Sequence, residues 1–244
     1  MTHLLLDTDI LLYKAASSAE QEVDWGDDVW SLFTDLNDAK KSFQYQVEQI
    51  YEATKSKEAT FCMTDHSGNF RKEVDPSYKS NRKGSRKPVG YVALCNWVRD
   101  TYKTITKPML EADDCMGILA TKPENIGKCI IVSDDKDMRT VPSRIFRPMS
   151  GEFIDVTEQD ADRFFLTQCL MGDPTDGITG LKGVGAKTAE KILGLRPHWS
   201  LVEQAYMKAG HSRDDAIQQA RLVRILRWTD WDADKETVKL WKPN

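Results

Sequence analysis

Acidic residues that directly follow short apolar runs are the feature that most constrains this chain. Each run is short and almost continuously apolar, which favours a strand covered on both faces within a parallel sheet. The carboxyl ends of parallel strands lie at one edge of a sheet, so we expect the acids to line one crevice there. The runs with their acids are Leu4–Leu6 with Asp7, Ala59–Met63 with Asp65, and Lys128–Ser133 with Asp134, Asp135 and Asp137.

Helical periodicity between these runs completes an α/β pattern. Strands that alternate with helices indicate a mostly parallel sheet flanked by helices. After about Thr157 the strand signal disappears, and helices broken by Gly and Pro follow. We therefore expect a sheet domain over residues 1–157 and a helical lobe over residues 158–244. The predicted helices are Asp38 to about Lys55, Gly90–Thr104 and Glu111–Ala120, and the candidate fourth strand is Ser143–Arg147.

The composition excludes several classes of protein. Five cysteines are scattered without a C-x-x-C pair, and four histidines are far apart. This usage fits reduced thiols in a cytoplasm and disfavours structural zinc or a histidine-based triad. No apolar run approaches the roughly 18 residues of a membrane span, and no basic segment precedes the first apolar stretch, so a signal peptide is not expected.

Charge is segregated along the chain, although the net charge is only −4. Residues 71–87 carry seven bases and two acids, a local net of +5. Residues 15–39 carry seven acids and no base. The basic segment offers a patch that suits a nucleic-acid partner, which the net charge alone would disfavour.

Two groups of aromatic residues fall outside these patterns. Trp25, Trp30 and Phe33 lie within the acidic stretch, where we expect them to anchor a surface helix to the core. The alternative is a docking site for a partner protein. Trp228 and Trp231, near the C-terminus, are expected to be core anchors.

The acids after the strands point to metal chemistry. Glu111 and Asp114 share a face of the helix expected beside the crevice, and Asp113 lies between them. Any one of these acids would more simply end a strand or cap a helix, but their repetition at matching positions favours a shared site. Clustered carboxylates repel one another, and hard ions such as Mg²⁺ or Mn²⁺ relieve that repulsion. Two such ions can activate water and stabilise the leaving oxygen of a phosphodiester, while Lys and Arg hold its phosphate.

Four motifs in a fixed order carry a resemblance to a known family. "FRKEVDPSYKSNRK", "LEADD", "SDDKD" and "MGDPTDGITGLKGVGAKTAEKIL" together resemble the 5′-nuclease superfamily of flap endonucleases, polymerase I 5′-nuclease domains and phage 5′–3′ exonucleases. "DPSYKSNRK", "KPVGY" and "PMLEADDCMG" look most like the podovirus phage exonucleases. The resemblance covers about Leu4–Leu193. It implies a PIN-like sheet with a C-terminal helical lobe that carries a helix-three-turn-helix DNA-binding motif.

The resemblance also implies a set of site residues. Tyr78, Lys79 and Arg82 match an element at the base of a helical arch, here about residues 78–104. In the family the Lys and Arg hold the scissile phosphate and the aromatic ring stacks on the terminal base. Arg71 is a further candidate for the phosphate. The acids that match the metal cage are Asp7, Asp65, Glu111, Asp113, Asp114, Asp135, Asp137, Asp173 and Asp176.

The glycine-rich turn in the lobe suggests a contact with DNA backbone. Such a turn lets backbone N–H groups at a helix N-terminus approach a phosphate, and its spacing is not that of a Walker A motif. Out of context it could be any glycine-rich turn. The family uses it as a helix–hairpin motif that grips duplex DNA, with K⁺ at the turn. The residues expected to bind DNA are Lys83, Arg86, Lys182, Gly183, Gly185 and Lys187.

The function implied is a metal-dependent 5′–3′ exonuclease or structure-specific 5′-nuclease in phage DNA replication, recombination or host-DNA breakdown. Its expected partners are duplex DNA with a 5′ end, nick or flap, and the RNA strand of an RNA–DNA hybrid. A non-catalytic DNA-structure binder, a haloacid-type phosphatase using the Asp7 and Asp9 pair, and a PIN-type ribonuclease remain alternatives. Asp9 and Asp134 are acids without a place in the general motif.

Overall fold

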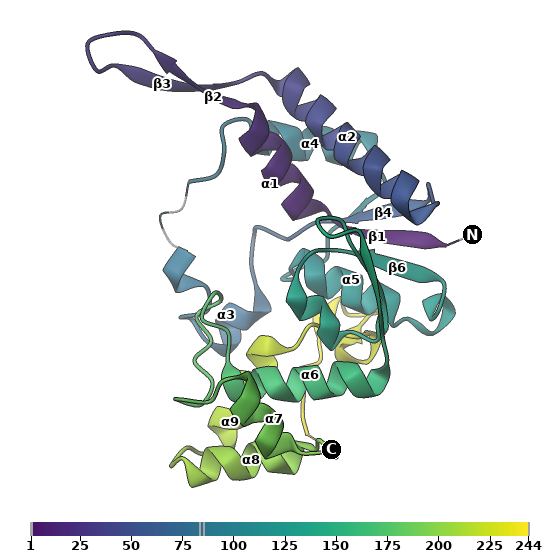
Figure 1. Cartoon of the computed structure of the whole chain (residues 1–244), viewed down its shortest axis with the longest axis vertical. Helices are drawn as coiled ribbons and strands as arrows, with labels where there is room; N and C mark the ends of the chain where they lie inside the picture. Colours follow the sequence, from purple (N-terminus) through teal and green to yellow (C-terminus); the bar gives the residue numbers. More distant parts are fainter. Residues whose placement is uncertain (1, 83, 85, 244) are drawn as a thin grey trace.

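A six-stranded sheet forms the centre of the computed structural model, which describes residues 2–82, 84 and 86–243 (Figure 1). The strand order is β5-β4-β1-β6-β7-β8. All neighbouring pairs are parallel except β7 and β8, which pair antiparallel at one edge. The mostly parallel α/β sheet is therefore confirmed, and β8 is an unpredicted edge strand. The strands are β1 His3–Asp7, β4 Ala59–Cys62, β5 Thr104–Ile105, β6 Cys129–Val132, β7 Ser143–Arg147 and β8 Glu152–Val156.

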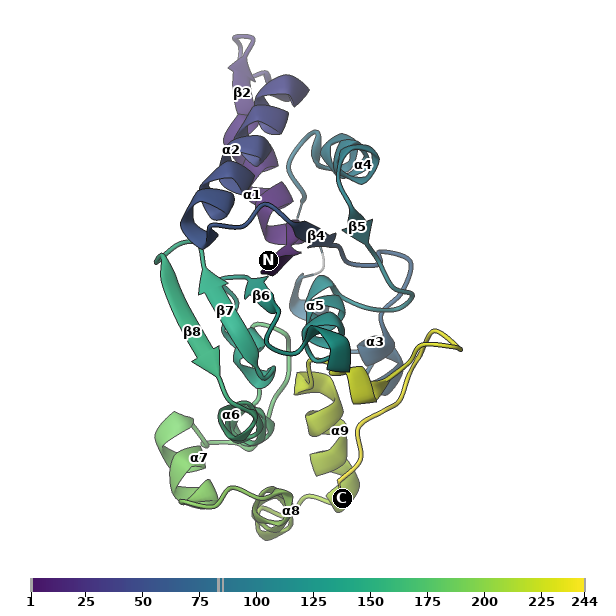
Figure 2. The ribbon, with the colours of Figure 1, turned by 90° about the vertical axis from the view of Figure 1, so that its right-hand side faces the viewer.

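Helices cover both faces of the sheet, as continuous apolar strands require (Figure 2). Leu4 and Leu6 of β1 face a core shared with α1, α2 and α4. Leu5, between them, faces a second core shared with α5. All three leucines are at most 2% exposed, so β1 is buried on both sides. The helices of these layers are α1 Thr8–Ala19, α2 Leu36–Thr54, α4 Tyr91–Thr101 and α5 Ala112–Ala120.

Short helices connect these layers, and a helical lobe follows the sheet. The side chain of Thr157 caps the first helix of the lobe by accepting from the N–H of Asp160. The connecting helices are α3 Phe70–Val74, η1 Ser80–Arg82, η2 Pro123–Asn125, η3 Lys136–Thr140 and η4 Trp228–Asp230. The lobe helices are α6 Glu158–Met171, α7 Ala186–Leu193, α8 Trp199–Lys208 and α9 Arg213–Val223.

The chain after α9 returns to the sheet side of the molecule. Ile225, Leu226 and Trp231 join the core beneath α5, and two short strands pair there, β9 Trp231–Asp232 and β10 Thr237–Val238. Trp231 is 3% exposed and Trp228 packs against the same core, which confirms both as anchors. No helix among the described residues is long and apolar enough to cross a membrane.

The acidic stretch forms a projecting hairpin rather than a surface helix. Strands β2 Glu20–Asp24 and β3 Trp30–Thr34 pair antiparallel and extend away from α1 and α2 (Figure 1). Gly26 with positive φ, followed by Asp27 and Asp28 also with positive φ, reverses the chain at the tip.

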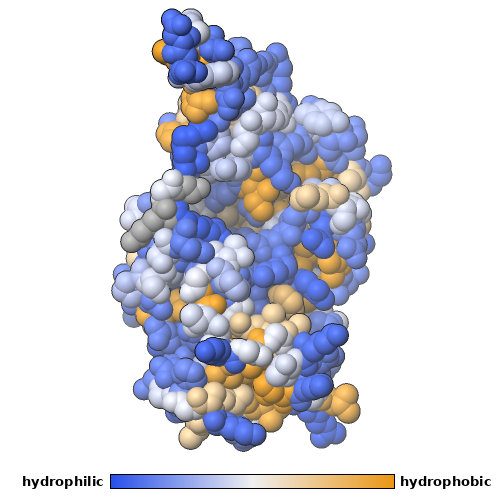
Figure 3. Space-filling view, turned by 60° about the vertical axis from the view of Figure 1, so that its left-hand side comes forward, coloured by the Kyte–Doolittle hydropathy of each residue, from blue (hydrophilic) through white to orange (hydrophobic). Residues whose placement is uncertain are grey.

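The expectation that aromatic residues of this stretch anchor a helix to the core is therefore wrong. Trp25, Trp30 and Phe33 are 69%, 59% and 55% exposed. Hydrophobic atoms accordingly appear among hydrophilic ones on the projection at the top of Figure 3. The ribbon leaves the body of the molecule, so no core surface lies within reach of these side chains.

The predicted arch is shorter than its sequence limits. Its C-terminal part is α4, which begins at Tyr91 and ends at Thr101, with strand β5 following. Leu94 and Val98 of α4 are fully buried against α1 and α2. We call residues 78–90 the basic segment, of which the structure describes 78–82, 84 and 86–90.

Candidate active site

Acids from both halves of the chain line one cleft of about 610 Å³ at the carboxyl ends of the central strands. Asp7 follows β1, Asp135 and Asp137 follow β6, and Asp113 lies in the first turn of α5. Of the predicted metal ligands, the structure brings these into the cleft: Asp7, Glu111, Asp113, Asp135, Asp137, Asp173 and Asp176. Asp9 and Asp134, the two acids without a family counterpart, line it as well.

Asp7 and Asp9 lie at the start of α1. Asp7 Oδ1 accepts from the N–H of Ile10 at 3.4 Å, and Oδ2 accepts from the Ser133 hydroxyl at 2.9 Å. Burial and then the neighbouring Asp9 raise the pKa of Asp7 to about 7. Asp9 Oδ2 accepts from the N–H of Thr64, whereas Asp9 Oδ1 is buried without a hydrogen-bond partner among the described residues. We call it the orphaned oxygen of Asp9.

Asp113, Asp135 and Asp137 extend this group. Burial, followed by repulsion from Asp7 and Asp135, raises the pKa of Asp113 well above its usual range. Burial and the Asp135 charge raise the pKa of Asp137 to about 6. Asp135 caps η3 by accepting from the N–H of Asp137, and Gln168 donates to Asp137 Oδ1 at 2.5 Å.

Five acids of the cleft form no ion pair with a described residue, although Lys79 lies near Asp113 and Lys136 lies near Asp137. Within the part of the chain that the structure describes, no lysine or arginine forms an ion pair with them. We call them the unpaired acids: Asp7, Asp9, Asp113, Asp135 and Asp137.

Three other acids of the cleft, Glu111, Asp173 and Asp176, are paired with cations. Lys79 Nζ lies 2.5 Å from Glu111 Oε1 and 3.5 Å from Asp176 Oδ2, and Arg82 Nη2 lies 2.5 Å from Asp176 Oδ1. Burial disfavours the charge of Glu111, but Arg71 and Lys79 outweigh it and lower the pKa of Glu111. Lys79 itself has φ of 53°, and its backbone N–H donates to the Asp176 carbonyl. This left-handed residue fastens the basic segment to the lobe.

Lys136 is a further cation that pairs with an acid of the cleft, and this role was not predicted from the sequence. Its Nζ lies 2.8 Å from Asp173 Oδ2. Burial of Asp173 is outweighed by the Lys136 contact, so the pKa of Asp173 is lowered. The signal was present, because Lys136 stands between the two acids of the predicted D-x-D. We call Glu111, Asp173 and Asp176 the paired acids.

Arg71 and Asp114 form a buried ion pair, which corrects the roles expected for both. Arg71 is 1% exposed and Asp114 is fully buried. Arg71 donates to both Asp114 oxygens at 2.6 and 2.8 Å, to Glu111, and to the carbonyls of Leu222 and Arg224. All five guanidinium N–H groups are thus used. Arg71 has no donor left for a phosphate, and Asp114 faces away from the cleft as a partner for Arg71.

Tyr78 is also buried, at 3% exposure, and packs into the core of the lobe. Its hydroxyl lies 2.9 Å from Glu111 Oε2 and 3.2 Å from Asp176 Oδ2. The ring therefore lies beneath Lys79 and has no face open to a DNA base, contrary to the stacking role that the resemblance implied.

Asp65 lies outside the cleft lining, so it is not brought together with the other predicted ligands. Its carboxylate accepts from the N–H of Met109 at 2.8 Å and from the N–H and hydroxyl of Ser67. The backbone N–H of Met109 is the main reason that the pKa of Asp65 is lowered. Through these hydrogen bonds Asp65 holds the loop after β4 in place.

The cleft fits hard divalent ions by its chemistry. None of the described residues lining it is a histidine or a cysteine, and carboxylate oxygens are the ligands that Mg²⁺ and Mn²⁺ prefer. Among the described residues no three acids, histidines or cysteines are gathered around one ion position. Like charges keep such carboxylates apart, and the orphaned Asp9 oxygen and the raised pKa values mark where a positive charge would be favourable.

The residues predicted to bind DNA fall in three places. Lys83 lies outside the described residues. Arg86 forms an ion pair with Glu20 at the base of the hairpin. The remaining four lie exposed in the turn that leads into α7 or at its start, and both glycines there face open space: Lys182, Gly183, Gly185 and Lys187.

The fold and the acid-lined cleft are typical of hydrolases that cleave phosphodiesters with metal ions. The family model described as 5′-3′ exonuclease, N-terminal resolvase-like domain, matches residues 2–159. An exonuclease of Escherichia phage T7 is 33% identical over 98% of this chain and 93% of its own length. An exodeoxyribonuclease of Enterobacteria phage T3 is 31% identical, with 98% and 92% covered.

A solved structure of similar fold is the T5 flap endonuclease crystallised with metal ions. It superposes with a TM-score of 0.66 at 18% identity, over 92% of this chain and 90% of that one. The chain belongs to the 5′–3′ exonuclease family. It is a hydrolase, a 5′–3′ nuclease of DNA in a family for which metal dependence is typical.

Proposed function

We propose that this chain is a Mg²⁺- or Mn²⁺-dependent 5′-nuclease that removes nucleotides or short oligonucleotides from 5′ ends of duplex DNA during phage DNA replication, recombination or host-DNA breakdown. The observation that carries the proposal is the division of the cleft into unpaired acids and acids already paired with Lys79, Arg82 and Lys136. Divalent ions, when bound by the unpaired acids with Glu111 and Asp173, would activate water and stabilise the leaving oxygen.

The cations of the cleft would hold the scissile phosphate. Lys79 is held between Glu111 and Asp176, with only 20% of its side chain exposed. Arg82 is half exposed at the mouth. A phosphate entering the cleft would meet both cations at fixed positions, which reduces the reorganisation needed as negative charge develops. Tyr78 and Arg71 would act indirectly, by positioning Glu111 through hydrogen bonds.

The lobe would grip the duplex behind the cleft. We place the boundary between a nuclease domain and a helical lobe at residues 157 and 158, and we assign a helix-three-turn-helix motif to α6, the glycine-rich turn and α7. Support comes from the exposed turn, where Lys182 and Lys187 flank backbone that a phosphate could approach. K⁺ is a candidate bridge at this turn. Contacts of this kind read phosphate rather than base sequence.

The substrates we propose are blunt, nicked and flapped duplexes, with the RNA strand of a hybrid as a further one. Solved proteins of similar fold contain DNA, including a T5 flap endonuclease and the catalytic core of Rad2. Because phage and host DNA lie in the host cytoplasm, we place the activity there. The 5′ strand would pass beneath the basic segment to reach the cleft.

Product mapping tests this function. Duplexes labelled at the 5′ end, with blunt, nicked or flapped ends, would be incubated with Mg²⁺ or with excess chelator. Short 5′ products with Mg²⁺ and none with chelator are expected. Cleavage that persists in chelator would contradict the metal mechanism. Tight DNA binding without cleavage in Mg²⁺ or Mn²⁺ would instead indicate a non-catalytic binder.

A further inference from the structure

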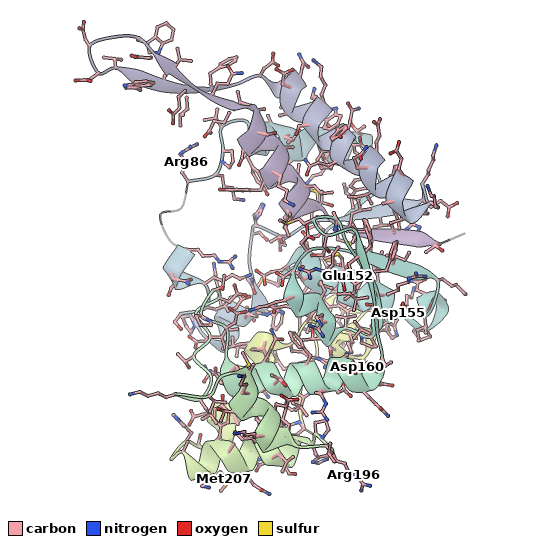
Figure 4. All side chains as sticks on the ribbon, viewed as in Figure 1. Arg86, Glu152, Asp155, Asp160, Arg196 and Met207 are labelled. Carbon is pink, nitrogen blue, oxygen red and sulfur yellow. The ribbon has the colours of Figure 1, made fainter. Side chains whose placement is uncertain are left out.

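The base of the projecting hairpin touches the C-terminal end of the basic segment. Glu20, the first residue of β2, accepts two hydrogen bonds from Arg86: Nη2 to Oε1 and Nη1 to Oε2, both at 2.7 Å. Glu20 Oε2 also accepts from the backbone N–H of Val89 at 2.6 Å. Arg86 is labelled in Figure 4, beneath the hairpin and beside the N-terminal helices. One carboxylate thus holds both a side chain and the backbone of the segment.

Two further observations support this contact between the hairpin and the basic segment. The two Arg86 hydrogen bonds and the Val89 N–H lower the pKa of Glu20 to about 2, so Glu20 stays charged throughout the ordinary pH range. Gly90, one residue after Val89, has φ of 81°, and a Cβ there would lie 3.1 Å from Thr34 Cγ2. Thr34 is the last residue of β3, so both strands of the hairpin meet the segment where it enters α4.

The other end of the basic segment is fastened to the lobe. Asn81 donates to the carbonyls of Pro174 and Thr175, both at 3.1 Å. Arg82 pairs with Asp176. The segment therefore spans from the lobe to the hairpin and is held at each end by an acid and by backbone contacts.

We propose that Glu20 is a positioning residue for the nuclease reaction, which holds the Arg86–Gly90 end of the basic segment at the hairpin and so fixes the passage through which DNA reaches the cleft. Arg86 then acts through Glu20 rather than by contacting DNA, because a guanidinium with two donors committed to one carboxylate is less available to a phosphate. The proposal rests on DNA passing beneath the segment. It assigns a role to the acidic stretch that the cleft itself does not explain.

A double-mutant cycle tests the proposal. Glu20→Ala, Arg86→Ala and the double variant would be compared in the full chain, with kcat and KM measured on a 5′-labelled duplex in Mg²⁺. We expect each single variant to raise KM about fivefold, the range that a well-aligned exposed ion pair supports. The value of kcat should stay near that of the unchanged chain, because the acids, Lys79 and Arg82 are not disturbed. The double variant should equal Glu20→Ala, because the loss of Arg86 removes nothing further once Glu20 is gone.

Limited trypsin digestion provides a readout that does not depend on activity. Cleavage between residues 82 and 87 should be several times faster in Glu20→Ala, and Glu20→Gln, which keeps an acceptor oxygen, should fall between it and the unchanged chain. Glu22→Ala is the matched control. Glu22 is an exposed acid on the same strand, opposite Leu32, and forms no ion pair among the described residues.

Three outcomes would overturn the proposal. Unchanged digestion in Glu20→Ala would show that the contact does not hold the segment. Faster digestion with unchanged KM would show that the segment is held but that DNA does not use the passage. Additive losses in the double variant would show that Arg86 binds DNA directly. A chain without nuclease activity on any duplex would refute the proposed function instead, while leaving the digestion result intact.

Discussion

The two sides of the cleft contain the same residue type in opposite electrostatic states. Among the unpaired acids, burial and then repulsion from neighbouring acids raise the pKa values of Asp7 and Asp113. Among the paired acids, Glu111 and Asp173 contact lysines, which outweigh their burial and lower their pKa values. The two sides lie in one cleft, so solvent exposure alone does not explain the difference. What differs is whether a lysine or arginine forms an ion pair with the acid.

The unpaired and the paired acids are therefore expected to have separate functions. Acids that form no ion pair carry a free-energy cost that a bound divalent ion relieves, so they are the main candidates for holding metal, with Glu111 and Asp173 completing the set. Acids with such neighbours already hold Lys79, Arg82 and Lys136 in fixed positions, so their main effect is to present positive charge to a phosphate. Substitutions of the unpaired acids and of the cations held by the paired acids should therefore have different effects.

The largest effect is expected on the unpaired side. Asp113→Asn should lower cleavage in Mg²⁺ by about 10³-fold or more, because a ligand for the ions is lost. The same substitution should raise the melting temperature in chelator, since it removes one of several mutually repelling charges. Cleavage assays would test the expected loss of activity, and thermal unfolding in chelator would test the expected rise in melting temperature. A lowered melting temperature in chelator would show that Asp113 stabilises the fold and would contradict the distinction between unpaired and paired acids.

A nearby acid on the same helix should behave in the opposite way. Asp114→Ala leaves Arg71 buried without its partner and should reduce the free energy of unfolding by about 3–5 kcal/mol. Urea unfolding followed by circular dichroism measures this. Asp65→Ala is the control, because that acid holds only a loop and should cost about 1 kcal/mol. Equal losses for the two variants would contradict the structural role given to the Arg71 pair.

Removal of a cation from the paired side should affect rate more than stability. Lys79→Ala is expected to lower kcat by about 10²-fold, the loss typical of one preorganised donor, with a smaller change in KM. Steady-state kinetics on a blunt duplex separates the two constants. If KM rises while kcat is retained, Lys79 is a tether for DNA and not a group that stabilises charge during cleavage.

The smallest effect concerns metal binding without substrate. Mg²⁺ at roughly 10- to 30-fold above its Kd should stabilise the folded chain by about 1–2 kcal/mol relative to chelator. The increment should shrink in Asp113→Asn and persist in Asp65→Ala, as measured by thermal unfolding with and without Mg²⁺. An increment that disappears in Asp65→Ala would return Asp65 to the metal site, where the sequence had placed it.

Much of the fold was predictable because its signals are local. The apolar runs at β1, β4 and β6 and the periodicity of α2 are properties of neighbouring residues, and the structure confirms them. The acids at the strand ends followed from the same signals. The hairpin was not predictable in this way, because whether Trp25 or Trp30 meets a core depends on where the ribbon points.

The adjacent residues Asp113 and Asp114 show where prediction from the sequence stopped. Successive helix positions differ by about 100° in direction, so one carboxylate enters the cleft and the other meets Arg71. Both belong to the same motif, and only the packing of α5 between the sheet and the returning C-terminal chain distinguishes them. The same holds for Tyr78, whose ring was expected on DNA and lies in the lobe core.

From the sequence alone, the strands β1, β4, β6 and β7 were predictable, together with the acids that follow three of them and hence the concentration of negative charge at one edge of the sheet. The tertiary structure alone decided which acids receive a cation. Arg71 meets Asp114, Lys79 meets Asp176 and Arg86 meets Glu20 across long stretches of chain. Strand and helix patterns depend on neighbouring residues, whereas an ion pair depends on the direction and depth of two side chains that only the packed core brings together.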